Sequence, residues 1–355
     1  MHTVEGPRVV TSVADWRAGD LEPSERWRRR FHADELAELD RALRHARTRS
    51  PGLELARLGA ADFPMPGLEP LVDGLRDELI DGCGLVVLDG FDVSPYSTDE
   101  LRAIWWGLSL HIGRPVAQSW RGDLIGDVRD LGTGITGKAG RGYTSNVELG
   151  FHSDASDVTG LFFLAQGASG GESRFASSVA VHNELARRRP DLLELLYQPM
   201  PCSWQSNERP GDEPWYPMPV FGRVGEDTAC AYVSTNVLRA ADNVGAPPLD
   251  EAQIEAVRAV GRVAAEPGMW FERRFEPGAM VFTNNHTVLH SRTEFRDHPE
   301  PERKRHLLRI WLSMPNSRAL PPTFASYFGD VRAGAERGGY PTRSDRPVFE
   351  TRLHG

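Results

Sequence analysis

The stretch Gly150-Phe151-His152-Ser153-Asp154 places an imidazole and a carboxylate two residues apart, next to a bulky apolar residue. On a β-strand, side chains two positions apart lie on the same face. His152 and Asp154 could therefore reach one shared ligand. The spacing alone is weak evidence, because the same pair also occurs in solvated loops and on protein surfaces.

A second stretch far downstream gives the pair more weight. In Gly278-Ala-Met-Val-Phe-Thr-Asn-Asn-His-Thr-Val-Leu-His290, the last histidine follows an apolar run and precedes a basic segment. Two imidazoles and one carboxylate from separate strands form a facial triad, which holds Fe(II) and leaves further coordination positions open. His152, Asp154 and His290 are therefore the candidate metal ligands.

The composition favours strands over a helical bundle. The chain has 355 residues and a hydrophobic content of 40 %, enough for a sizeable core, and its 35 Gly and 26 Pro indicate many turns. A barrel with insertions can reach this length as one domain. We expect a helical appendage over residues 1–70, a jelly-roll domain over 71–320, and a tail over 321–355 that packs on the domain.

The charge and the cysteines exclude several classes of protein. A net charge of -9 argues against a nucleic-acid binder, which normally carries a basic surface. The three cysteines, Cys83, Cys202 and Cys230, contain no CxxC pair and suggest neither a disulfide framework nor a thiolate zinc site. The chain shows no signal sequence and no apolar run of membrane length. We expect a soluble cytoplasmic enzyme without a membrane or nucleic-acid partner.

Apolar periodicity predicts the order of the elements. Residues 34–49 read as a helix capped by Asp34 and packed outside the core. Further helices are expected over 71–80, 97–112, 183–189, 190–197 and 249–265, and strands over 82–91, 161–165, 229–233 and 270–313. The predicted fold is mainly β with helical insertions, with a double-stranded β-helix (jelly-roll, cupin-like) core flanked by helices.

A glycine-rich segment precedes the His-x-Asp pair. Residues 121–147 contain seven glycines, at positions 122, 126, 132, 134, 137, 140 and 142, and show no apolar periodicity. A loop of this length in a compact domain is usually functional or disordered. Its position favours an active-site lid, with an ordinary surface loop as the alternative.

Taken together, four motifs resemble the taurine and 2,4-D dioxygenase family of Fe(II)- and 2-oxoglutarate-dependent oxygenases, close to its clavaminate-synthase-like branch. The resemblance covers about residues 71–315. The motifs follow one another in this order: Gly150-Phe-His-Ser-Asp154, Gly170-Gly-Glu-Ser173, Asn284-Asn-His-Thr-Val-Leu-His290 and Arg305-His-Leu-Leu-Arg309-Ile-Trp-Leu.

The resemblance implies the cofactors and the reaction. His152, Asp154 and His290 would bind Fe(II), and the carboxylate at position 154 implies an oxygenase, because a halogenase needs that position vacant. The cosubstrate 2-oxoglutarate and O2 would occupy the open positions and yield succinate and CO2. Hydroxylation of an unactivated C–H bond is the default outcome, and desaturation or ring formation stays open.

Two arginines on one predicted strand complete the site. By resemblance, Arg305 would hold the distal carboxylate of 2-oxoglutarate with help from Ser173, where the family more often has Thr. Arg309 would meet the substrate or support the cosubstrate. Four residues apart on a strand, both guanidiniums can face the same way, and a guanidinium fork suits a carboxylate.

The substrate is less well defined by the sequence. Arg309 suggests an anionic group, and Glu148 and Asp157 could meet a cationic one, which together would suit an amino acid or an amino-acid-derived small molecule. Asn146 is a further candidate for the pocket wall, and His286 is a fallback metal ligand. A hydrolytic divalent-metal barrel and a catalytically silent anion-binding barrel are the alternatives, and the oligomeric state stays unknown.

Overall fold

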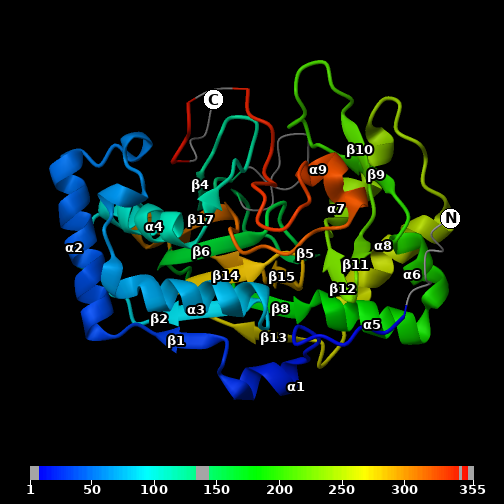
Figure 1. Ribbon diagram of the computed structural model, residues 1–355, viewed down its shortest axis with the longest axis horizontal. Helices are drawn as coiled ribbons and strands as arrows, with labels where there is room; N and C mark the ends of the chain where they lie inside the picture. The colour runs from blue at the N-terminus through cyan, green and yellow to red at the C-terminus, as the bar shows by residue number, and fades with distance from the viewer. Residues whose placement is uncertain (1–7, 133–143, 344–345, 351–355) are drawn as a thin grey trace.

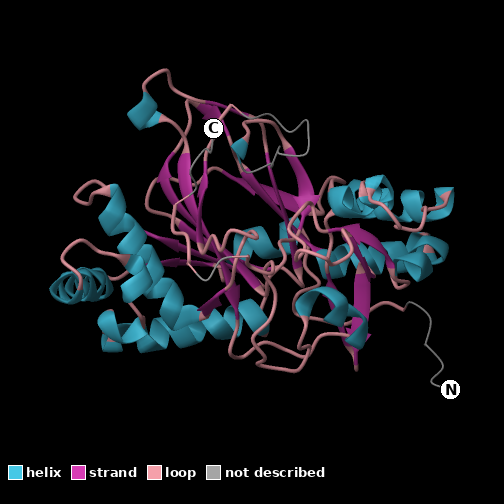
Figure 2. Ribbon diagram, turned by 90° about the horizontal axis from the view of Figure 1, so that it is seen from above, coloured by secondary structure: helices cyan, strands magenta, loops and turns pink. Residues whose placement is uncertain are grey.

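The computed structural model describes residues 8–132, 144–343 and 346–350. The fold mixes helices and sheets, with helices on both flanks of a central group of strands (Figures 1 and 2). Two sheets dominate. The larger has seven strands in the order β1-β2-β14-β6-β17-β3, with β4 also paired to β17, and the smaller has the order β13-β8-β15-β5.

The strands of the larger sheet come from the whole length of the chain. Their bounds are Arg28–Arg30 (β1), Leu85–Asp89 (β2), Arg114–Pro115 (β3), Ile125–Val128 (β4), Val158–Ala165 (β6), Met280–Asn284 (β14) and His306–Ser313 (β17). Those of the smaller sheet are Leu149–His152 (β5), Ser173–Ser177 (β8), Trp270–Arg273 (β13) and Val288–Arg292 (β15). Neighbouring pairs are antiparallel except β1 with β2.

Strand β17 shows how the sequence positions the site. Side chains alternate between the two faces of a strand. Leu308, Ile310 and Leu312 belong to the core between the sheet and the helices, whereas Leu307 and Arg309 line a cavity on the other face. The alternation of side chains along the strand therefore directs Leu308, Ile310 and Leu312 to the helices, and Leu307 and Arg309 to the interior.

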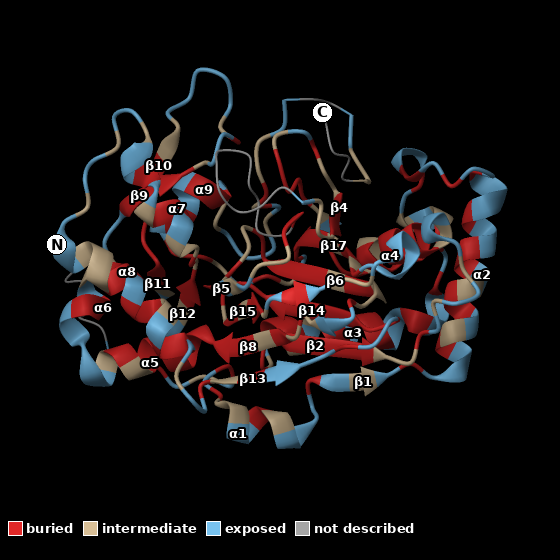
Figure 3. Cartoon of the chain, turned by 180° about the vertical axis from the view of Figure 1, so that it is seen from behind, coloured by how far each residue is buried: buried red, intermediate tan, exposed pale blue. Residues whose placement is uncertain are grey.

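A first layer of helices covers the outer face of the larger sheet. It consists of α2 (Ala33–Arg49), α3 (Glu69–Ile80) and α4 (Thr98–Ile112). Trp105 of α4, fully buried, has its ring 5.6 Å from that of Phe162 and 5.3 Å from that of Phe282. Figure 3 shows the buried inner sides of these helices facing the sheet.

Residues 8–70 are more closely integrated than expected. Leu39, Leu43 and Ala46 of α2 are part of the same buried cluster as the sheet, so the prediction that this helix packs outside the core is wrong. The helix begins at Ala33, and Asp34 lies in its first turn, where the backbone N–H of His32 donates to Glu35. The division of the chain at residues 70 and 320 stays a prediction.

The other flank carries a second helical layer with its own core. Its helices are α5 (Ser178–Arg188), α6 (Pro190–Leu196), α7 (Ser234–Leu238), α8 (Glu251–Ala264) and α9 (Ala325–Phe328). They pack against two strand pairs. One consists of β9 (Met200–Ser203) and β10 (Trp215–Met218), and the other of β11 (Phe221–Val224) and β12 (Asp227–Cys230). The remaining short elements are α1 (Ala18–Leu21), β7 (Ser169–Gly170) and β16 (Phe295–Arg296).

Two sequence predictions need adjustment here. Helix α5 begins at Ser178, five residues before the predicted start, because the Ser177 hydroxyl accepts the Ala180 N–H as an N-cap. Within the glycine-rich segment 121–147, Ile125–Val128 forms a strand paired to β17, so this part is not a loop. Residues 133–143 of the segment lie outside the described residues, and the lid stays a prediction.

The described part of the C-terminal segment returns to the domain. The N–H of Gly339 donates to Ala155 and that of Tyr340 to Ala117, and Val348 bonds with Gly122 and Leu124. This segment therefore packs against the residues that follow the metal-binding motif. Among the described residues, no helix is long and apolar enough to cross a membrane.

Candidate metal centre and cosubstrate pocket

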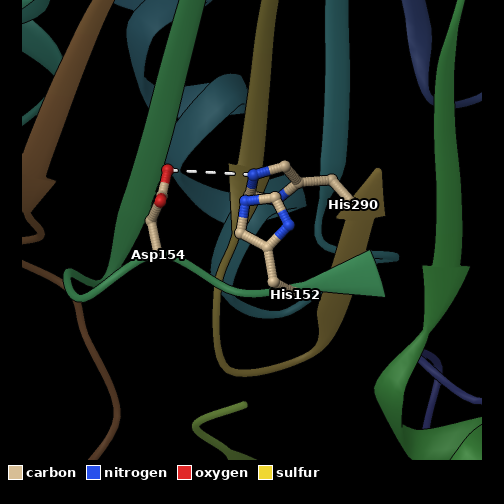
Figure 4. Close-up of side chains that lie close together, drawn as sticks. All are labelled: His152, Asp154 and His290. Atoms are coloured by element: carbon tan, nitrogen blue, oxygen red, sulfur yellow. Dashed lines mark ion pairs between the residues drawn. The ribbon is translucent and has the colours of Figure 1, made fainter. Parts of the chain in front are cut away.

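Three side chains converge where the smaller sheet faces the interior. His152 is the last residue of β5, His290 lies in β15, and the two are paired across the strands. One ligand atom from each of His152, Asp154 and His290 lies within 4.8 Å of the others, and Figure 4 shows the side chains pointing toward one another. This spacing lets one metal ion be bound by all three.

Asp154 is not on the strand that carries His152. Strand β5 ends at His152, and Asp154 follows it in the turn toward β6. The carboxylate is held instead by the Thr159 hydroxyl, which donates to Oδ2 at 2.8 Å, and the Asp154 N–H donates to Asn285 Oδ1 at 3.0 Å. The two-residue repeat of a strand therefore correctly predicted that His152 and Asp154 lie close together. It did not predict that hydrogen bonds, and not a shared strand, hold Asp154 in place.

Thr159 and Asn285 form one network. The Asn285 side-chain N–H donates to Thr159 Oγ1 at 3.1 Å and to the Ser156 carbonyl at 3.0 Å. On the histidine side, His152 Nδ1 bonds to the Gly150 carbonyl at 2.8 Å, so its Nε2 is the atom available to a metal. Such contacts orient metal ligands. Asn285 lies inside a recognised motif, whereas nothing in the sequence singled out Thr159.

The electrostatics of the site suit metal binding. Burial alone would raise the pKa of Asp154, but the charges of Arg309, His290 and His152 outweigh it and lower that pKa to about 2. Burial lowers the pKa of His290 to about 3, with His152 acting in the same direction. An ionised carboxylate and a neutral imidazole are the forms that bind metal ions. The donor set thus fits Fe(II), for which two imidazoles and one carboxylate are typical.

A cavity extends from the metal ligands between the two sheets. Side chains from both sheets line it, namely Val128, Leu149, His152, Asp154, Thr159, Leu161, Ser173, Phe175, Val281, Thr283, His290, Ser291, Arg292, Arg305, Leu307 and Arg309. Asp154 is the only carboxylate among these lining residues, against three guanidiniums. The cavity is therefore suited to an anion.

Arg305 is the residue of this cavity that most strongly indicates an anion-binding site. It is 2 % exposed, and its Nε and Nη1 have no hydrogen-bond partner in the described protein. Burial lowers its pKa to about 9. A buried guanidinium without a partner is costly unless a ligand supplies the charge. The distal carboxylate of 2-oxoglutarate fits this requirement, and Ser173 lines the same cavity.

The Gly170-Gly171 pair allows this arrangement. Both glycines have positive φ, 72° and 78°, which favours glycine. A Cβ on Gly171 would lie 3.0 Å from Arg305 Nε, and one on Gly170 would lie 2.1 Å from the Glu294 carbonyl oxygen. The motif therefore leaves room for the Arg305 side chain.

Arg309 lies between the inner cavity and a larger outer pocket of about 300 Å³. Its Nε donates to Gln118 Oε1 at 2.7 Å, its Nη1 lies 3.6 Å from Asp154 Oδ1, and its guanidinium stacks 5.0 Å from the Trp311 ring centroid. Three carboxamides from two other segments also line the outer pocket: Gln205 and Asn207 from one, and Asn236 from the other. The sequence did not identify Gln118 or these carboxamides.

The predicted substrate residues have different positions. Glu148 lines the outer pocket and pairs with Arg174 at 2.8 Å. Asn146 lines neither the cavity nor the outer pocket, and its carbonyl accepts the Phe295 N–H.

Asp157 is part of a separate buried network and lines neither the inner cavity nor the outer pocket, and its role as a substrate contact stays a prediction. Its carboxylate binds His286 Nε2 at 3.0 Å, Arg337 Nε at 2.7 Å and the Met314 N–H at 2.9 Å. His286 is thereby held away from the metal ligands, which removes it as a fallback ligand. Both residues stabilise the packing of residues 314–337.

Comparisons with known proteins agree with this geometry. FR-33289 synthase of Streptomyces rubellomurinus is 28 % identical over 334 residues, or 93 % of this chain and 97 % of that protein. The taurine hydroxylase-like protein SAT17 of Stachybotrys chartarum is 28 % identical over 300 residues, or 81 % of this chain and 76 % of that protein.

Solved structures share the fold at lower identity. Asparagine oxygenase, in complex with Fe(II), 3-hydroxyasparagine and succinate, matches with a TM-score of 0.61 and 19 % identity over 81 % of this chain and 93 % of that one. The non-heme iron oxygenase OrfP, in complex with Fe, succinate and 3-hydroxy-L-arginine, matches with a TM-score of 0.59 and 16 % identity over 81 % of this chain and 94 % of that one.

The match to a family model identifies the family of this chain. Residues 48–311 match the model of the taurine catabolism dioxygenase TauD, TfdA family. This range includes all three candidate metal ligands, Arg305 just before β17, and Arg309 within it. The chain belongs to the TauD, TfdA family and is an Fe(II)- and 2-oxoglutarate-dependent oxygenase.

Proposed function

We propose that the enzyme hydroxylates an unactivated C–H bond of a small acidic molecule, an amino acid or a compound derived from one. The supporting observation is that the three converging ligands and the guanidinium of Arg305, unpaired within the described residues, line one cavity. The metal would bind at one end of this space, and the distal carboxylate of the metal-bound cosubstrate would reach Arg305 at the other. In this proposal His152, Asp154 and His290 hold Fe(II), and Arg305 with Ser173 holds 2-oxoglutarate.

The fold supports the same proposal. We infer that the two facing sheets are the halves of a double-stranded β-helix, with the cavity as its interior. Side chains from β6, β14 and β17 on one side and from β5, β8 and β15 on the other line that cavity. A jelly roll of this kind would place the ligands on rigid strands, which keeps their geometry precise.

The residues of the chain would orient the reactants and exclude water. When bound, Fe(II) activates O2 so that one oxygen atom enters the substrate C–H bond and the other enters succinate, with release of CO2. Arg305 would fix the distal end of 2-oxoglutarate, and Arg309 would fix an anionic group of the substrate beside the metal. The apolar walls Leu161, Phe175 and Leu307 limit access of water to the inner cavity.

The outer pocket supports an acidic substrate. Its carboxylates are Asp154, which is a metal ligand, and Glu148, which is paired with Arg174, while Arg309 and Arg239 supply positive charge. Among its lining residues, none is an unpaired acid suited to an ammonium group. An acidic compound with hydrogen-bonding groups would match the carboxamides of this pocket. Two solved structures of similar fold contain hydroxyasparagine and hydroxyarginine, which supports an amino acid or a related compound as the substrate.

Succinate formation tests the proposal. The purified enzyme, supplied with Fe(II), ascorbate, O2 and 2-oxoglutarate, should release succinate, and a panel of acidic metabolites should stimulate that release. His152→Ala should abolish it. Intact iron binding without succinate would favour a silent anion-binding barrel, and metal-dependent hydrolysis without consumption of 2-oxoglutarate would favour the hydrolytic alternative. A cytoplasmic location and the absence of a nucleic-acid partner stay predictions.

A further inference from the structure

A second buried arginine lines the cavity near Arg305. Arg292 lies on β15 two residues after His290, on the same face of the strand, and is paired across the sheet with Ser173. It is 6 % exposed and lines the same cavity. Neither the sequence motifs nor the proposed function above assigns it a role.

The contacts of Arg292 leave part of its guanidinium available. Its Nη2 donates to the backbone carbonyls of Ser145, at 2.8 Å, and Val147. Its Nε is buried without a hydrogen-bond partner in the described protein, and no ion pair to a carboxylate is formed within the described residues. Within the part of the chain that the structure describes, the hydrogen bonds of this buried positive charge are therefore to neutral groups.

Arg292 and Arg305 both lie close to one aromatic ring. The guanidinium carbon of Arg292 lies 4.8 Å from the ring centroid of Phe295, and that of Arg305 lies 5.0 Å from the same centroid. Two buried like charges that line one cavity repel each other, and burial without a partner adds to the cost. A carboxylate in the cavity that contacts both would offset both effects, and its two oxygens offer enough lone pairs for both guanidiniums.

We propose that Arg292 is a second positioning residue for 2-oxoglutarate, whose distal carboxylate it binds together with Arg305. This inference rests on the proposed function. The same guanidinium holds the carbonyls of Ser145 and Val147, just before β5 and His152. Cosubstrate binding is thereby coupled to the order of residues 144–148, because one side chain contacts both.

A comparison of two oxoacids tests the contact directly. Calorimetry on the anaerobic Fe(II)-loaded enzyme would measure the Kd of 2-oxoglutarate and of 2-oxopentanoate, which has the same carbon chain without the distal carboxylate. Arg292→Gln should raise the Kd of 2-oxoglutarate at least about tenfold, as expected for the loss of a hydrogen bond between charged groups. The Kd of 2-oxopentanoate should change less than about twofold, and Arg292→Lys should restore part of the loss.

Arg274→Gln is the matched control. Arg274 also holds backbone carbonyls, those of Gly167 and Gly170, but does not line the cavity. Arg274→Gln should change the Kd of 2-oxoglutarate and the Kd of 2-oxopentanoate by the same factor. The proposal would be overturned if Arg292→Gln weakened the binding of both oxoacids equally, or if it did not weaken the binding of 2-oxoglutarate. A wild-type enzyme that binds 2-oxopentanoate as tightly as 2-oxoglutarate would also overturn it, and one that binds neither oxoacid would instead contradict the proposed function.

Hydrogen exchange provides a second readout. In the wild-type enzyme, 2-oxoglutarate should slow amide exchange over residues 144–148 more than 2-oxopentanoate does. In Arg292→Gln that difference should disappear. Protection that is the same with both oxoacids in the wild-type enzyme would contradict the coupling through Arg292.

Discussion

At the scale of single residues, the metal ligands depend on neighbours that do not themselves bind metal. Thr159 donates a hydrogen bond to the Asp154 carboxylate, and Asn285 bonds to both residues. The two together determine which way the carboxylate points after the chain has left β5. Their role is to limit the carboxylate to the orientation that faces the two imidazoles.

Thr159→Val should therefore weaken metal binding. Valine keeps the shape of the side chain and removes its donor, so metal affinity should fall by about 10- to 100-fold, the usual effect of losing such a contact. Titration with Fe(II) under anaerobic conditions would measure it. Thr159→Ser keeps the hydroxyl and is the control. An unchanged affinity in the valine variant would show that Asn285 alone orients the carboxylate.

Asp157 should behave as a structural residue. Asp157→Asn removes the negative charge that faces Arg337, a side chain only 1 % exposed, and leaves a buried guanidinium unpaired. Breaking such a pair costs about 3–5 kcal/mol of unfolding free energy. Denaturant unfolding would measure the loss, and the KM for substrate in the folded enzyme should stay unchanged. A raised KM with unchanged stability would reinstate Asp157 as a substrate contact.

At the scale of elements, the contrast between β17 and helix α5 shows what patterns can reveal. In strand β17 Arg309 stands among apolar residues, so the strand and its cationic position were readable from the sequence. Helix α5 carries His182, which is fully buried and bonded to Asn183 and to the Tyr197 hydroxyl. Its partners come from the helix itself and from the residue after α6, and a single buried polar network of this kind gives no periodic signal.

His182 should make stability depend on pH. Burial lowers its pKa from 6.5 to about 4, although the contact with Asn183 acts in the opposite direction. Between these values the unfolded chain binds more protons than the folded one. The contribution is therefore fully present above about pH 6.5 and is lost as the pH falls toward 4. Unfolding curves between pH 4 and 7 would measure it, and the pH dependence should be flatter in His182→Gln than in the wild-type protein.

At the scale of the whole molecule, the N-terminal segment and the catalytic core form one packed unit. Strand β1 pairs with β2, the Trp16 indole donates to the Cys83 carbonyl, and α2 packs on α4. The family match begins at residue 48, yet the residues before it contribute to the same buried clusters. The function of this segment is therefore at least partly to support the larger sheet.

Leu43→Ala should destabilise the entire enzyme. The leucine is 3 % exposed within the cluster that includes the sheet, and such truncations cost about 2–5 kcal/mol. Unfolding followed by circular dichroism and by succinate formation should shift together. Arg44→Ala, on the exposed side of α2, should leave both nearly unchanged. If Leu43→Ala melted a helical fraction while activity persisted, the segment would be an independent appendage.

The sequence was sufficient for the features that depend on local pattern and motif order. The apolar runs of β6 and β14, the alternation in β17 and the candidate ligands His152, Asp154 and His290 could all be read from it. The strand within residues 121–147 was missed because Ile125–Val128 is only four residues long and includes a glycine and an aspartate. Its pairing with β17, 179 residues away at the Asp127–His306 contact, stabilises it.

What the sequence alone determined is the identity of the reacting groups, because a metal triad and its arginines need particular side chains in a particular order. The tertiary structure decided how those groups are held and which neighbours join them. Asp157 and His286 pair with each other away from the metal ligands, whereas Arg292 and Thr159 line the inner cavity and Gln118 lines the outer pocket. The reason is physical: burial and pairing are properties of segments brought together by folding, and local sequence carries little information about which distant partner will satisfy a buried charge.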